Sequence, residues 1–143
     1  MKPHRLRGLA SEYAFASQYY ELIDDEEYSL ISPTLDTGWD FMVAKTNTKI
    51  QVKRHNVKIK NTNVLDIRRK RNKGTGNYTG EEFDYIAIHD TVNDKFIISN
   101  ISQLRNKHGK LKTAFSVRSL VDEGFEVLVK WEIQFYMEIV ERH

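Results

Sequence analysis

The sequence predicts a single α/β domain in which a mixed, mostly antiparallel sheet is flanked by helices. Two patterns lead to this prediction: one long amphipathic helical repeat near the N-terminus, and a series of shorter segments with the alternation typical of strands. A length of 143 residues fits one hydrophobic core, so we expect residues 1–143 to form one domain. With 40% hydrophobic residues, 7 Gly and 2 Pro, the composition excludes a disordered or collagen-like chain.

The first element is an amphipathic helix from Leu6 to Ile23, in which apolar residues recur every three or four positions. Four consecutive acids at 24–27 end its apolar face. A short strand at 28–33 follows and is stopped by Pro33, and residues 36–38 form a turn.

Two hairpins make up the centre of the predicted sheet. Strands at 39–44 and 49–54 are joined by the polar link 45–48, and strands at 83–89 and 95–99 are joined by 90–94. Alternation in the second strand places Ile50 and Val52 on one face, so Gln51 and Lys53 share the other.

The remaining segments give weaker patterns. Alternation at 57–60 and 64–67 predicts a hairpin arm at about residues 55–76, with a flexible loop at 73–77. We expect a helical turn at 102–107 and a short helix at 116–123. Residues 125–139 fit both a strand and a helix, and their length favours a helix.

Cysteine is absent, which excludes disulfides, thiolate zinc sites and cysteine nucleophiles. The five histidines are spaced too widely for a local His-x-x-x-His zinc pair. No apolar stretch approaches the roughly 20 residues of a membrane span, and the N-terminus lacks the apolar core of a signal peptide. We therefore expect a soluble, cytoplasmic protein.

Positive charge is concentrated along the chain although the net charge is only +2. Residues 45–73 hold 11 of the 22 Lys and Arg against one acid, Asp66, whereas residues 122–143 carry six acids against two cations. Such a basic segment attracts a phosphate backbone through counterion release. On charge alone, a solvated face or a sorting signal at 68–71 remains the alternative.

The residues with the most informative chemistry are Glu12 on the helix, Asp40 at the start of one strand, and Gln51 and Lys53 on the next. Phosphodiester hydrolysis needs a divalent metal held by hard oxygens, an activated water, and positive charge beside the phosphate. Asp40, the Gln51 amide oxygen, the Val52 carbonyl and Glu12 would hold Mg²⁺, for which Mn²⁺ can substitute. Lys53 would position or deprotonate the water and stabilise the transition state.

The order helix, strand, strand with an acid, then acid-x-Lys resembles the PD-(D/E)xK nuclease superfamily over about residues 5–100. The spacing from Pro33 to Asp40 and the segment 77–88 add to this resemblance. Within the superfamily the chain is most similar to the group I intron-encoded homing endonucleases, in which Gln-x-Lys replaces acid-x-Lys as in Gln51-Val52-Lys53. The resemblance implies a restriction-endonuclease-like core, Mg²⁺-dependent cleavage of double-stranded DNA, assembly as a homodimer or homotetramer, and catalysis by Glu12, Asp40, Gln51 and Lys53.

Three other functions stay open at this point. A Holliday junction resolvase also has the early helical glutamate, but that family carries Glu where this chain has Gln51. A restriction endonuclease and a non-catalytic DNA-binding module are the other two, the last because a neutral amide weakens metal binding. In all of them the basic arm would contact DNA phosphates or read guanine edges in the major groove. The expected DNA-binding residues are His55, Lys58, Lys60, Arg68, Arg69, Lys70, Arg71 and Lys73.

Overall fold

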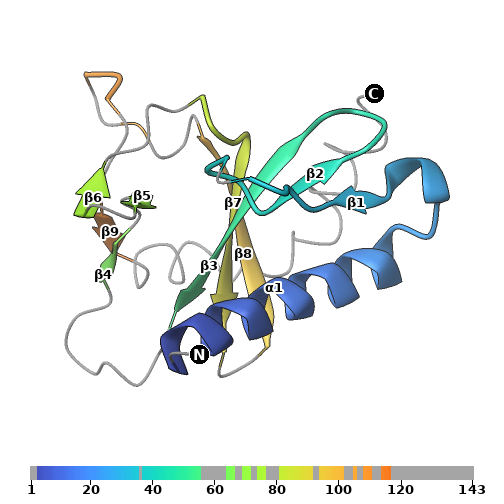
Figure 1. Ribbon diagram of the computed structural model, residues 1–143, viewed down its shortest axis with the longest axis horizontal. Coiled ribbons are helices and arrows are strands. Elements are labelled where there is room, and N and C mark those ends of the chain that lie inside the picture. The colour runs from blue at the N-terminus through green and yellow to red at the C-terminus, as the bar shows by residue number, and fades with distance from the viewer. Residues whose placement is uncertain are drawn as a thin grey trace.

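The long helix and the sheet packed on it determine where the candidate site lies. The computed structural model describes residues 3–35, 37–55, 64–66, 69–71, 74–76, 81–91, 94–101, 105, 108–110 and 114–116. Helix α1 (Pro3–Leu22) is followed by the 3₁₀ turn η1 (Glu26–Tyr28) and by a five-stranded sheet. Figure 1 shows α1 lying across the sheet. No helix in the described part of the chain is long and apolar enough to cross a membrane.

The sheet has the strand order β1-β2-β3-β7-β8. These strands are β1 (Leu30–Ile31), β2 (Phe41–Val43), β3 (Lys49–His55), β7 (Tyr85–Asp90) and β8 (Lys95–Asn100). All neighbours run antiparallel except β3 and β7, which are parallel. The predicted α/β class with a mixed, mostly antiparallel sheet is therefore confirmed.

The hydrophobic core lies between α1 and one face of the sheet. Phe15 and Tyr19 of α1 are fully buried against Ile50 and Val52 of β3 and against the facing side chains of β7 and β8. The predicted alternation in β3 is confirmed, because Ile50 and Val52 belong to this core and Gln51 does not. All six residues of β7 are buried, as expected for a central strand covered on both faces.

Two turns set the path of the chain around β2. Gly38 has φ +80°, a conformation that glycine adopts without steric cost, and it precedes the entry into β2. Asn47, with φ +58°, lies in the link between β2 and β3. The Val43 amide donates to the Thr48 carbonyl at 2.8 Å and closes this hairpin.

The structure corrects several predicted boundaries. Tyr28 lies in η1 rather than in a strand, because the Asp25 side chain caps that turn by accepting from the Glu27 amide at 3.0 Å. Residues 74–76, predicted to be a loop, form β6 (Gly74–Gly76), which pairs with β5 (Arg69–Arg71). Backbone pairing does not require an apolar side chain, so a glycine-rich strand leaves no alternation to find.

The segment 64–67 also has a partner that the sequence did not indicate. Strand β4 (Val64–Asp66) pairs antiparallel with β9 (Ala114–Ser116), about 50 residues further along the chain. Ser116 was predicted to start a short helix and instead ends this strand. The expected partner of β4 at 57–60, the rest of the helix to 123, most of the turn at 102–107 and the segment 125–139 lie outside the described residues.

Candidate active site

Asp40 is placed by backbone hydrogen bonds at the edge of the hairpin formed by β2 and β3. The register pairs Phe41 with Ile50, so Asp40 lies opposite Gln51. The Asp40 amide donates to the Ile50 carbonyl at 2.9 Å, and Asp40 Oδ2 accepts from the Val52 amide at 2.7 Å. One carboxylate oxygen of Asp40 is thus fixed to the middle residue of Gln51-Val52-Lys53 on β3.

Glu12 and Asp40 meet although they come from different elements. Their carboxyl groups lie close enough to shift each other's pKa, and both are partly buried. Burial, together with the negative charge of Asp40, raises the pKa of Glu12 to about 7. Burial also raises the pKa of Asp40, an effect partly offset by the Val52 amide, the Glu12 hydrogen bond and the charge of Lys53. Three of the four predicted catalytic residues therefore interact.

Gln51 lies opposite Asp40 in the hairpin register and carries an amide oxygen. Its side chain is only 9% exposed, and its Nε2 makes a long 3.4 Å contact to the Val52 carbonyl. Among the described residues none donates a hydrogen bond to Gln51 Oε1. A buried amide oxygen without a donor is costly, which suits an oxygen that receives its partner from outside the protein.

The donor set fits a hard divalent cation. It comprises the two carboxyls, the Gln51 amide oxygen and the Val52 carbonyl, all oxygens of the kind that Mg²⁺ prefers. Burial raises the pKa of both carboxyls, and a cation bound between them would favour the charged form of each. Within the described part of the chain no group of three or more His, Cys, Asp or Glu could hold a metal, so such a site depends on the amide and carbonyl oxygens as well.

A pocket of about 440 Å³ opens beside the two carboxyls, between α1 and the β1–β2 side of the sheet. Glu12 and Asp40 contribute to its wall, and Tyr13, next to Glu12, is 71% exposed. The other lining residues are Leu9, Ala16, Tyr20, Leu30, Ser32, Pro33 and Phe41. Pro33, singled out by its spacing to Asp40, therefore lies in the same pocket as that acid.

The predicted DNA-binding residues are placed less completely. His55 ends β3 and is only 6% exposed, so its imidazole presents little surface to a phosphate, and burial lowers its pKa. Arg69, Lys70 and Arg71 form β5 in a two-stranded ribbon with β6. Lys58, Lys60, Arg68 and Lys73 lie outside the described residues.

Comparison with known proteins supports the fold. No protein-family model matches the sequence, and no curated protein matches it. A solved structure described as a bacterial homing endonuclease, I-Ssp6803I, superimposes with a TM-score of 0.57 at 19% sequence identity. The match covers 71% of this chain and 72% of that one. The fold is homing-endonuclease-like.

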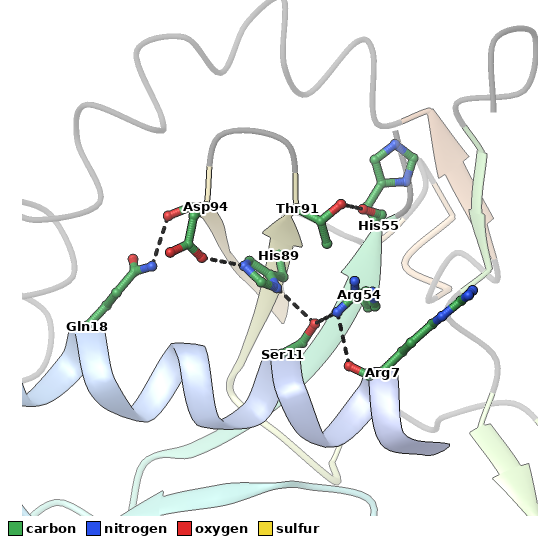
Figure 2. Close-up of polar contacts among 8 residues, drawn as sticks. All are labelled: Arg7, Ser11, Gln18, Arg54, His55, His89, Thr91 and Asp94. Atoms are coloured by element: carbon green, nitrogen blue, oxygen red, sulfur yellow. Dashed lines mark hydrogen bonds and ion pairs between the residues drawn. The ribbon is translucent and has the colours of Figure 1, made fainter. Parts of the chain in front are cut away.

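A second polar cluster, which the sequence did not suggest, lies between α1 and the sheet. Ser11, Arg54, His89 and Asp94 are linked by hydrogen bonds (Figure 2). Ser11 and His89 are 78 positions apart, so no local motif connects them. The one available signal was strand alternation, which puts Arg54 on the face opposite Lys53.

Replacing Glu12 by glutamine is expected to remove a pH dependence of stability. The folded state holds a proton on Glu12 up to about pH 7, whereas the unfolded chain loses it near 4.5, so the free energy of unfolding falls as pH rises between these values. Because Glu12 is only partly buried, solvent screens the repulsion, and we expect about 1–2 kcal/mol. Chemical denaturation in EDTA from pH 4.5 to 8 measures this slope.

A control must show whether removing a carboxyl elsewhere on α1 has the same effect. Glu21→Gln, at an exposed position of the same helix, should keep the wild-type slope. Equal slopes for wild type and Glu12→Gln would show that the Glu12 carboxyl is not perturbed in the folded protein.

Proposed function

We propose that the chain is a Mg²⁺-dependent, site-selective endonuclease of the PD-(D/E)xK type that hydrolyses phosphodiester bonds in double-stranded DNA. The observation that carries this proposal is the interacting carboxyl pair Glu12–Asp40 in the wall of one pocket, within the influence of the Lys53 charge. The similarity to a homing endonuclease structure supports it at the level of the fold.

Each residue of the site has a distinct role in this proposal. Asp40 and Glu12 would hold the cation, with Gln51 Oε1 and the Val52 carbonyl as further ligands. Bound there, Mg²⁺ supplies Lewis-acid stabilisation of the phosphate oxygens. Lys53 would position the attacking water or, as the neutral amine, take its proton, and the ammonium would offset the negative charge that develops on the phosphate. The amide of Val52 keeps Asp40 in place through Oδ2, and Oδ1 of Asp40 would be the oxygen that binds the cation.

The basic segment would hold the duplex next to this site. The arm at about 55–76 follows β3 directly, so its cations come from the same part of the chain as Lys53. A two-stranded ribbon such as β5–β6 fits the major groove, where arginines read guanine edges. One such site cuts one strand, so we propose that a homodimer or homotetramer cleaves the duplex.

Incubation with randomised duplex DNA, followed by sequencing of the cleaved ends, tests the proposal. We expect cleavage at a restricted set of sites with Mg²⁺ or Mn²⁺ and none in EDTA. Branched and linear DNA offered side by side separate a junction resolvase from this activity. Binding without cleavage, on a pool that includes the native locus, would favour a non-catalytic DNA-binding module, which the neutral Gln51 keeps as the second candidate.

Replacing Gln51 by glutamate is expected to tighten Mg²⁺ binding and to weaken the metal-free fold. A third carboxylate adds an anionic ligand, and we expect the dissociation constant to fall about tenfold, or about 1.4 kcal/mol. Without metal, the added charge lies buried near Asp40 and should lower the free energy of unfolding. Calorimetric titration with Mg²⁺ measures the first effect, and equal affinity in both proteins would show that residue 51 is not a ligand.

A further inference from the structure

Four side chains join α1 to the two central strands through directional hydrogen bonds (Figure 2). Ser11 Oγ lies 2.8 Å from His89 Nδ1, and His89 Nε2 lies 2.7 Å from Asp94 Oδ1. Arg54 Nη1 donates to Ser11 Oγ at 3.3 Å and to the Arg7 carbonyl at 3.1 Å. Both central strands therefore bind the same turn of the helix.

Strand register explains why these groups converge. In the parallel pair β3–β7, Arg54 is the direct Cα partner of His89. Alternation places both on the face that also carries Val52, which is the face covered by α1. The His89 ring is stacked on Phe96, with centroids 4.5 Å apart and planes at 9°, and this packing limits its rotation.

The hydrogen bonds form a chain with one consistent direction. A carboxylate only accepts, so His89 Nε2–H donates to Asp94, and in the neutral imidazole the lone pair on Nδ1 accepts from the Ser11 hydroxyl. The lone pairs of Ser11 Oγ then accept from Arg54. Each group is used, and the tautomer of His89 follows from this network.

The order Ser11, His89, Asp94 is that of a serine-hydrolase triad, but the surroundings exclude that chemistry. Ser11 is 1% exposed, and its oxygen already receives the Arg54 donor. A nucleophile must reach a carbonyl carbon and have its oxygen free to attack. What the cluster does is join α1 to β3 and β7 by hydrogen bonds.

Glu12 follows Ser11 in the helix, so a bond that fixes Ser11 also fixes the direction in which Glu12 points. Phe15 holds α1 by packing, which is not directional. The hydrogen bonds from Tyr19 to the Tyr28 carbonyl and from the Leu30 amide to Tyr20 are directional, but they lie about two turns beyond Glu12. We propose that Ser11, with Arg54 and His89, is a positioning residue that sets the rotation of α1 so that Glu12 meets Asp40. This inference rests on the proposed function, because Glu12 is a ligand there.

A second anchor on the same helix offers a matched control. Gln18 Nε2 donates to the Asp94 carbonyl at 2.9 Å, about two turns beyond Ser11. It joins α1 to the same hairpin, β7–β8, but lies six residues from Glu12. Gln18→Ala removes one bond between α1 and this hairpin without touching the turn that carries the acid, whereas Ser11→Ala removes the bonds to His89 and Arg54.

The experiment compares Mn²⁺ binding by the full chain without DNA, followed as loss of the free-ion EPR signal, and cleavage kinetics with Mg²⁺. For Ser11→Ala we expect a loss of about tenfold in Mn²⁺ affinity and of about ten- to a hundredfold in kcat, as for residues that orient metal ligands. KM for DNA should stay unchanged. Gln18→Ala should leave Mn²⁺ affinity and kcat at wild-type values.

Two His89 variants keep the test decisive if Ser11→Ala fails to fold. An asparagine amide ends near the position of Nδ1 and can still accept from Ser11, whereas a glutamine amide ends near Nε2 and can reach only Asp94. We expect His89→Asn to retain more Mn²⁺ affinity than His89→Gln, although both lose the ring that stacks on Phe96.

The outcomes separate this inference from the proposed function. Equal Mn²⁺ affinity in Ser11→Ala, Gln18→Ala and wild type would overturn the positioning role. Equal losses of Mn²⁺ affinity in Ser11→Ala and Gln18→Ala, or in His89→Asn and His89→Gln, would also overturn it. If wild type binds Mn²⁺ but cleaves no DNA, the proposed function fails and the Mn²⁺ comparison still decides the role of Ser11. Absence of Mn²⁺ binding by wild type would overturn both.

Discussion

Replacing Lys53 by alanine is expected to abolish DNA cleavage while leaving DNA binding nearly intact. The positive charge of Lys53 favours the charged form of Asp40 and so lowers the pKa of that carboxyl. Loss of one group that activates water and stabilises developing phosphate charge costs about 10²–10⁴-fold in rate. DNA binding depends on many cations, and Lys53 is only one of the 22 Lys and Arg of the chain. The slope of log affinity against log salt concentration should therefore change by about one charge at most.

Lys49→Ala provides a matched control for this prediction. Lys49 begins the same strand, and alternation places it on the same face as Lys53, about 13 Å away along β3. Single-turnover cleavage and DNA binding without metal, measured on both variants, separate catalysis from attraction of the duplex. If purified Lys53→Ala cleaves at the wild-type rate, the proposed mechanism is wrong.

The helix and the sheet were predictable because their patterns are local. Periodicity identified α1, and alternation identified β3, β7 and β8 to within one or two residues. The parallel contact between β3 and β7 and the pairing of β4 with β9 join segments far apart in the chain. Such pairings leave no local signal, and the glycines of β6 resemble a loop because pairing through the backbone requires no particular side chain.

The candidate site was predictable in part for the same reason. Alternation placed Gln51 and Lys53 on one strand face, and hairpin register brought Asp40 opposite Gln51. The sequence did not predict how closely the carboxyls of Glu12 and Asp40 interact, since this depends on how α1 is rotated on the sheet. The residues we propose to set that rotation, Ser11 and His89, were missed because they interact only in the folded chain.

Replacing Asp40 by asparagine is expected to abolish cleavage and to make the metal-free protein more stable above pH 7. The amide oxygen of asparagine can still accept from the Val52 amide, so the hairpin keeps its 2.7 Å anchor. The variant loses the negative charge that would bind the cation. Because the cation contributes several kcal/mol to transition-state stabilisation, we expect the rate to fall about 10³-fold. It also removes a buried charge next to Glu12, and proteins commonly gain stability when such a functional site is neutralised.

Asp84→Asn is the matched control for this change, because Asp84 Oδ2 likewise accepts from a β3 amide, that of Lys49, at 2.9 Å. Asp84→Asn makes the same carboxyl-to-amide change beside the first residue of β3, and it should affect neither cleavage nor the stabilisation by Mg²⁺. Thermal unfolding at pH 8 with and without Mg²⁺ gives the decisive comparison. A wild-type protein that Mg²⁺ stabilises and an Asp40→Asn variant that it does not would tie the cation to this carboxylate. An equal shift in both proteins would place the cation elsewhere, since a ligand stabilises the folded state only through the site that it occupies.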